Sequence, residues 1–80
     1  MSLQPYTQSA LALKPLTQYK HYKGDIYTII TIARIEATLE EVVVYQLASS
    51  PELTWVRPVT LFNEDVQYNG VTVKRFTPVE

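Results

Sequence analysis

The amino-acid sequence predicts an all-β fold, either a small, strongly bent antiparallel sheet or a partly open SH3-like barrel of about five strands. β-Branched and aromatic residues, which suit pleated strands, concentrate in short runs after residue 18. Turn-forming residues separate these runs at short intervals. The chain has 80 residues, of which 46% are hydrophobic and 19% charged. This composition is typical of a single folded domain.

The first 18 residues are expected to form a poorly structured arm ahead of a single small β domain over residues 19–80. The arm carries one charge, Lys14, and contains two prolines that interrupt regular structure. The stretch from Gln8 to Leu13 is compatible with a short helical turn, far below the length at which an isolated helix is stable. A docked arm and a loose arm both remain open. The apolar side chains available for docking are Leu11, Leu13 and Leu16.

Two neighbouring strands are predicted at residues 26–33 and 42–47, because both runs are dense in Ile, Val, Thr and Tyr. The first run is apolar on both alternating faces, which is typical of a strand inside a sheet. Its two faces carry Ile26, Ile30 and Ile32 on one side, and Tyr27, Ile29 and Ala33 on the other. The connection between the runs is short enough for a hairpin, so we expect the two strands to be antiparallel neighbours.

A third strand is predicted at residues 53–57, between a turn and a proline. Residues 49–52 read Ser-Ser-Pro-Glu, and this sequence favours a turn. Pro58 has no N–H to donate to a strand ladder and therefore ends the strand. Residues 60–63 are too few for a strand, and we expect a tight turn or a single 3₁₀ turn there.

The last predicted element is a hairpin around Asn69-Gly70, the pair that a type I′ turn prefers because both central residues need a positive φ. A two-residue loop sets the register of the two strands. The expected pairs are Tyr68 with Val71, Gln67 with Thr72, Val66 with Val73 and Asp65 with Lys74. The last pair joins opposite charges, which supports this register.

An ordered series of aromatic and basic motifs between Tyr19 and Phe76 resembles a known family. The motifs are Tyr19-Lys20-His21-Tyr22-Lys23-Gly24, Tyr27, Ala33, Val43-Val44-Tyr45, Trp55-Val56-Arg57-Pro58, Phe62, Gly70 and Val73-Lys74-Arg75-Phe76. In these motifs the chain is similar to the small bacterial family known as domain of unknown function number 1653. The resemblance implies a short bacterial cytoplasmic protein, or a module of a larger one, and it implies no activity. Relatives often carry a His-Ser-Glu-Thr-like stretch where this chain has Ile35-Glu36-Ala37-Thr38.

Composition argues against several classes of function. The chain has no cysteine, which excludes a disulfide framework, thiolate metal ligands and a cysteine nucleophile. Seven Lys and Arg against eight Asp and Glu give a formal net charge of -1, whereas general duplex-DNA binders are basic. No apolar run is long enough to span a bilayer and no signal peptide is visible, so we expect a cytoplasmic protein with no membrane partner. Without a glycine-rich phosphate loop or a serine beside a base, we expect no enzyme, no cofactor and no metal.

Seven residues are candidates for ligand binding, and they are Tyr19, His21, Tyr22, Lys23, Trp55, Arg57 and Arg75. His21 lies between aromatic and basic neighbours, which combine a stacking surface with positive charge. The more conservative interpretation of His21 is a half-buried side chain that hydrogen-bonds the backbone. Trp55 and Arg57 share one strand face and suit a binding hot spot. We nevertheless favour Trp55 as the anchor of the core, with Arg57 lying along its ring.

The leading functional hypothesis is a non-enzymatic interaction module that binds a protein segment or associates with a second copy of itself. Strand edges and aromatic pockets would supply the binding surface. The alternative is a nucleic-acid-binding module with aromatic side chains as stacking platforms. In that alternative Tyr22 stacks on a base, and the phosphate contacts come from Lys20, His21, Lys23 and Arg75.

Overall fold

The computed structural model describes residues 5–79, which form seven strands and two short helices. In chain order the elements are α1 (Gln8–Leu11), β1 (Gln18–His21), β2 (Ile26–Arg34), β3 (Glu41–Leu47), β4 (Ser50–Pro58), α2 (Val59–Phe62), β5 (Asp65–Tyr68), β6 (Val71–Lys74) and β7 (Phe76–Pro78). Strands predominate, so the predicted all-β class is confirmed.

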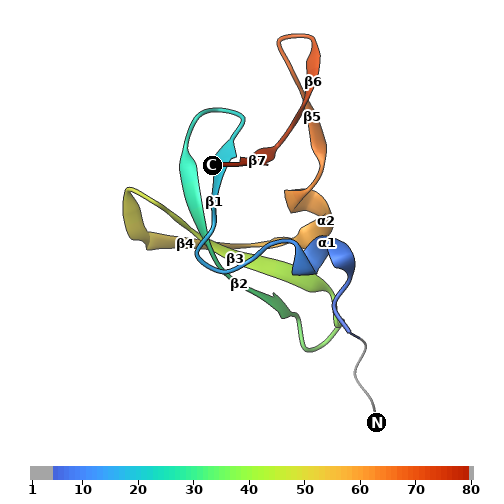
Figure 1. Cartoon of the computed structure of the whole chain (residues 1–80). Helices are drawn as coiled ribbons and strands as arrows, with labels where there is room; N and C mark the ends of the chain where they lie inside the picture. Colours follow the sequence, from blue (N-terminus) through green and yellow to red (C-terminus); the bar gives the residue numbers. More distant parts are fainter. Residues whose placement is uncertain (1–4, 80) are drawn as a thin grey trace.

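Five strands form one bent antiparallel sheet in the order β4-β3-β2-β1-β7, and β5 and β6 form a separate hairpin (Figure 1). The two end strands, β4 and β7, do not pair with each other, so the sheet stays open. The expected bent antiparallel sheet is confirmed, whereas an SH3-like barrel is not. Strands β1 and β7 were not predicted. Their four and three residues are too few to show the alternation of apolar and polar residues that is typical of a strand. Their pairing also joins distant parts of the chain.

Strand β2 contains a β-bulge that changes which side chains reach the core. Ile29 lies opposite Tyr45 and Thr31 lies opposite Val44, so Ile30 has no direct partner in β3. An extra residue of this kind moves the following side chains to the opposite face of the strand. Ile32 therefore shares a face with Ile29 and packs against the core. The simple alternation expected for this strand, which grouped Ile32 with Ile30, is wrong beyond the bulge.

The core lies on one face of the sheet and is closed by α2. The ring of Phe62 on α2 stacks on that of Phe76 on β7, with centroids 4.1 Å apart and planes 4° from parallel. Residues 59–62 form a short α-helix where a tight turn or 3₁₀ turn was expected. A helical turn brings Val59 and Phe62, three positions apart, to the same side, and both are buried.

The described part of the N-terminal arm is docked. Thr7 caps α1, since its hydroxyl accepts the Ala10 N–H at 3.3 Å. Glu41 holds the same residue, because its two carboxylate oxygens accept the N–H and the hydroxyl of Thr7, each at 2.7 Å. Ala10 and Leu13 are buried in the core, only 0% and 3% exposed.

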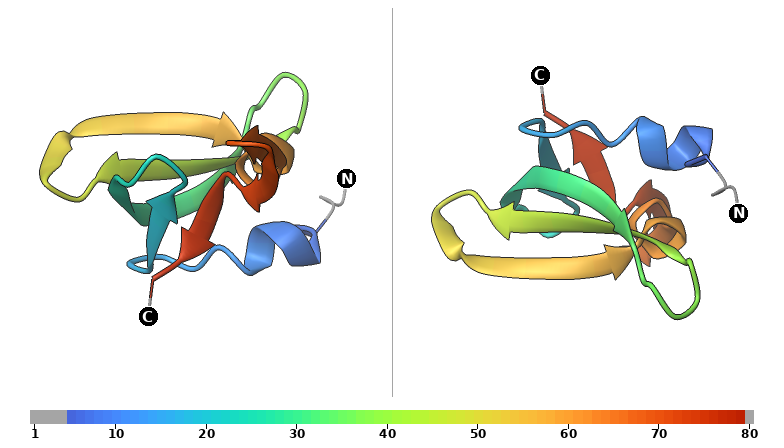
Figure 2. Two further views of the ribbon diagram at one scale, coloured as in Figure 1. Left: turned by 90° about the horizontal axis from the view of Figure 1, so that it is seen from above. Right: turned by 90° about the horizontal axis from the view of Figure 1, so that it is seen from below.

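Both views in Figure 2 place this arm on the side of the sheet away from β4. Of the three leucines available for docking, only Leu13 is buried, whereas Leu11 and Leu16 are exposed. Residues 1–4 of the predicted arm lie outside the described residues.

The hairpin of β5 and β6 forms as predicted. All four expected cross-strand pairs are present. Asn69 and Gly70 have φ angles of 52° and 77°, as a type I′ turn requires. The Nζ atom of Lys74 lies 3.1 Å from Oδ1 of Asp65.

The Gly70→Val substitution should lower the free energy of unfolding by about 1–2 kcal/mol, because a β-branched residue is strained at this positive φ. A domain of this size loses about 4–8 °C in melting temperature for each kcal/mol. Asn69→Gly keeps a positive φ accessible and serves as the control, with a melting temperature near that of the wild type. A Gly70→Val variant that melts at the wild-type temperature would contradict the turn.

The Leu13→Ala substitution should lower the free energy of unfolding by roughly 2–5 kcal/mol, because it opens a cavity in the core. Leu11→Ala, on the same segment but at an exposed position, should change stability little. Chemical denaturation of the two variants measures the difference. Equal, small effects would mean that the arm is not part of the folded core.

Candidate functional site

His21, at the end of β1, lies at the centre of a group of aromatic side chains. Its ring centroid is 4.5 Å from that of Tyr22 and 5.0 Å from that of Phe76. Its main-chain N–H donates to the carbonyl of Asp25 at 2.8 Å, and its Nδ1 accepts the N–H of Lys23 at 3.1 Å. The turn between β1 and β2 therefore fixes the ring, and the expected backbone hydrogen bond of His21 is confirmed.

A row of aromatic rings crosses the inner face of the sheet from the edge of β4 to the hairpin. We name it the aromatic row, and its members in spatial order are Trp55, Tyr45, Tyr27, Phe76, His21, Tyr22 and Tyr68. Successive ring centroids are 4.5–6.3 Å apart, mostly in the edge-to-face geometry that aromatic pairs favour. Tyr45 and Phe76 are buried and the other middle members are half-buried, whereas Trp55 and Tyr68 at the two ends are 40% and 44% exposed. The row is thus a core element that reaches solvent at both ends.

Basic side chains border the aromatic row. The Nε atom of Arg57 donates to the Tyr45 hydroxyl at 3.3 Å. The Lys23 ammonium and the Arg75 guanidinium lie 5.8 Å and 6.0 Å from the centroid of the Tyr22 ring, within cation–π distance.

Only some of these cations are neutralised. Arg75 pairs with Glu64 at 2.7 Å. In residues 5–79, Lys20 and Lys23 form no ion pair with a carboxylate. The uncompensated positive charge therefore lies beside His21.

The surroundings of His21 favour the neutral form of its ring. Burial lowers its pKa most, the charges of Arg75 and Lys23 lower it further, Asp25 opposes them, and Arg57 adds a smaller lowering effect. Because Nδ1 accepts a hydrogen bond, the proton of the neutral ring is on Nε2. The ring can therefore donate one hydrogen bond to a ligand.

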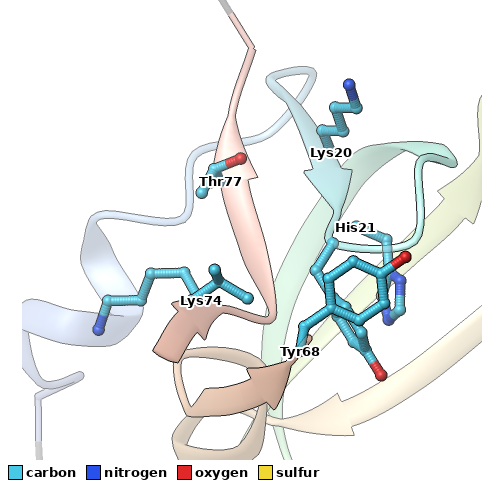
Figure 3. A pocket seen from close by; sticks show the side chains of 7 residues that line it. Lys20, His21, Tyr68, Lys74 and Thr77 are labelled. Carbon is cyan, nitrogen blue, oxygen red and sulfur yellow. The ribbon is translucent and has the colours of Figure 1, made fainter. Parts of the chain in front are cut away.

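Two hollows border β7. The first, of about 210 Å³, is lined by Lys20, His21, Tyr22, Tyr68, Val73, Lys74 and Thr77. Figure 3 shows Tyr68 and His21 on one side of this hollow, and Thr77 between the side chains of Lys20 and Lys74. The second hollow, of about 390 Å³, is lined by Ser9, Tyr19, Asn63, Lys74, Phe76, Thr77 and Pro78. The cation that lines the second hollow, Lys74, is paired with Asp65. The first hollow also contains Lys20, which has no ion pair in residues 5–79, so it combines aromatic surface with an unpaired charge.

The structure brings six of the seven candidate residues onto or beside the aromatic row, and Tyr19 is the exception. Tyr19 packs on Phe62, with centroids 5.5 Å apart, and lines the second hollow. The favoured interpretation of Trp55 as the core anchor is wrong, because its side chain is 40% exposed and Phe62 fills the core instead. In residues 5–79 Arg57 makes no cation–π contact with Trp55, and its Nε binds the Tyr45 hydroxyl.

Four members of the row were not among the candidates, namely Tyr27, Tyr45, Tyr68 and Phe76. The available signal was strand register, since Tyr45 lies directly opposite Trp55. The link from His21 to Phe76 depends on the pairing of β1 with β7, which residue spacing does not reveal.

Within residues 5–79, no three His, Asp or Glu side chains converge in a way that would hold a metal ion. In the same residues, no helix has the length and apolar character needed to cross a membrane.

Fold and site together define a small all-β protein with an open five-stranded antiparallel sheet and a partly exposed aromatic and basic surface. The model of the family described as protein of unknown function DUF1653 matches residues 17–78, and the chain belongs to this family. The crystal structure of a DUF1653 protein from Bordetella bronchiseptica has 33% sequence identity and a TM-score of 0.73, over 88% of this chain and 91% of that chain. The comparison with curated proteins finds no match. The family resemblance inferred from the sequence motifs is confirmed.

The lowered pKa of His21 should make the folded protein less stable in mild acid. As the pH falls through about 6.5, the unfolded chain takes up a proton that the folded chain does not, so the free energy of unfolding falls. This decrease should end below the pKa of the folded state. The His21→Gln variant should lose this part of the pH dependence in denaturation experiments between pH 7.5 and 5.5. An NMR titration of the His21 ring that gives a pKa above 6.5 would contradict the argument.

Proposed function

We propose that this chain is a non-enzymatic interaction module that takes a segment of a protein partner as an additional strand on the free edge of β4. The segment comes from another protein or from a second copy of the chain. Such strand addition derives affinity from main-chain hydrogen bonds and specificity from alternate side chains.

The observation that carries this proposal is the free edge of β4. The strand has nine residues and lies at the end of the sheet. In residues 5–79 no backbone hydrogen bond joins its outer edge to another segment. Leu53, Trp55 and Val56 are 45%, 40% and 61% exposed. Long apolar edge strands favour pairing with another chain unless they are protected.

Protection of this edge is confined to the ends of the strand. Pro51, Glu52 and Pro58 discourage pairing at these positions, since proline lacks an N–H and a charge is costly to cover. Residues 53–57 contain no proline and no acidic residue, and their one charged residue, Arg57, lies at the end of this stretch beside Pro58. The edge therefore has room for a short partner strand along its middle.

The inner face of β4 indicates which partner side chains fit. Trp55 and Arg57 are two positions apart and point to the same face. Arg57 uses its Nε for Tyr45, and its terminal N–H groups make no hydrogen bond with residues 5–79. A carboxylate of the partner can pair with them, while an apolar side chain two positions away covers Trp55. We expect a segment in which an acidic and an apolar residue are two positions apart.

The surroundings of His21 support binding rather than turnover. Its Nδ1 is already an acceptor for a main-chain N–H, and its ring is held between Tyr22 and Phe76. A general base needs a free ring nitrogen within hydrogen-bond reach of its substrate.

Peptides selected from a random display library against the purified protein should shift the backbone NMR signals of residues 53–57 and contain the acidic and apolar spacing described above. The Val56→Lys variant should bind them about tenfold more weakly, because a charge on the edge opposes strand pairing. Val71→Lys is the matched control, since Val71 is also a strand valine and is 58% exposed against 61% for Val56.

Light scattering of the wild type and of Val56→Lys tests whether the added strand comes from a second copy of the chain. If the wild type is a dimer and Val56→Lys is a monomer, a second copy of the chain is the partner. A monomer that enriches no peptide, or peptides that shift signals away from β4, would overturn the proposal.

A further inference from the structure

We propose that the hollow between β1, β7 and the hairpin, which His21 and Tyr68 line, binds a phosphorylated nucleoside. The nucleoside is either free or part of a single-stranded nucleic acid. This site is separate from the β4 edge and does not depend on strand addition there.

The aromatic side of the hollow provides a stacking surface. Tyr68 projects from β5 on the same side of the hollow as His21 (Figure 3), and the Tyr22 ring lies between them, 4.5 Å from the His21 ring and 5.3 Å from the Tyr68 ring. Tyr68 is 44% exposed, so a ligand can contact part of its surface. Stacking on such rings tolerates any base, because every base presents a flat aromatic face.

The opposite side of the hollow favours an anion. Thr77 lies between Lys20 and Lys74 (Figure 3), and its hydroxyl can donate to a phosphate oxygen. No carboxylate lines the hollow. The acidic residues of the adjacent hairpin are engaged, Glu64 by Arg75 and Asp65 by Lys74. Lys20 is therefore the cation whose charge is available to a ligand.

The size of the hollow limits what can enter. Its volume of about 210 Å³ is below the roughly 300–1,000 Å³ of sites that enclose drug-sized ligands. The base and the phosphate of one nucleotide can each contact one of these surfaces, while the rest of a longer ligand stays outside. A nucleoside phosphate carries both groups in one molecule, so a single ligand satisfies both sides of the hollow.

NMR titration with AMP and UMP tests the site, and His21 is a convenient probe because it is the one histidine of the chain. We expect shifts in residues 20–22, 68 and 73–77. The pKa of His21 should rise on binding, since a phosphate opposes the charges of Arg75 and Lys23. Adenosine and inorganic phosphate, each with one of the two groups, should bind about tenfold more weakly or worse. Inorganic phosphate that binds as tightly as AMP would overturn the proposal.

Single-stranded hexamers of A and of U distinguish the two sources of the ligand. Tighter binding of a hexamer than of a mononucleotide, with a steep loss in added salt, identifies a nucleic-acid strand. Equal binding identifies a free nucleotide. No shift with any of these probes would overturn the proposal.

Variants locate the site. Lys20→Glu should weaken AMP binding about tenfold through the loss of a charge contact, whereas Lys14→Glu, an exposed lysine outside the hollow, should not. Tyr68→Leu should weaken binding, and Tyr68→Phe should retain it because the ring remains. Val56→Lys should have no effect, which separates this site from the β4 edge. Equal binding by Lys20→Glu and Lys14→Glu would show that the hollow is not the site.

Discussion

The stacking of Phe62 on Phe76 holds the two halves of this small protein together. Phe62 follows the long hairpin of β3 and β4, and Phe76 follows the short hairpin of β5 and β6. Their rings lie 4.1 Å apart and are almost completely buried. This contact returns the end of the chain to β1, where β7 completes the sheet. Without a disulfide, an 80-residue chain depends on such dense burial of large side chains. The position of the short hairpin, and with it the hollow beside His21, follows from this stack.

The five-stranded sheet is open, because its end strands β4 and β7 do not pair with each other. Strand β7 has three residues, whereas β4 has nine residues and no covering segment among residues 5–79. The N-terminal arm lies on the far side and covers the core rather than the β4 edge, because Ala10 and Leu13 are its buried side chains. The two ends of the sheet thus differ in kind. One end offers a strand edge beside Trp55, and the other offers a hollow beside Tyr68.

Much of the fold could be predicted from residue patterns because its long strands and its hairpin are local. The runs that became β2 and β3 are dense in β-branched residues, and Asn69-Gly70 alone specifies the type I′ turn. Long-range features could not be predicted. The pairing of β1 with β7, the bulge at Ile30 and the packing of α2 depend on contacts between distant segments. The candidate residues were chosen by type, and most of them meet because strand pairing aligns them. The prediction that Trp55 anchors the core was wrong because a single tryptophan need not be buried.

Members of the aromatic row differ in burial, so substitutions in its middle affect stability and substitutions at its ends affect binding. Tyr45 and Phe76 in the middle are at most 6% exposed and contact the core, so substitutions there act on stability first. Trp55 and Tyr68 at the ends are 40% and 44% exposed, and they touch two rings and one ring of the row, respectively. Replacement of an end residue removes surface that a ligand can reach while the buried stack remains. Loss of binding at either end can therefore be measured in a folded protein, which makes this short chain well suited to assigning each surface to its own ligand.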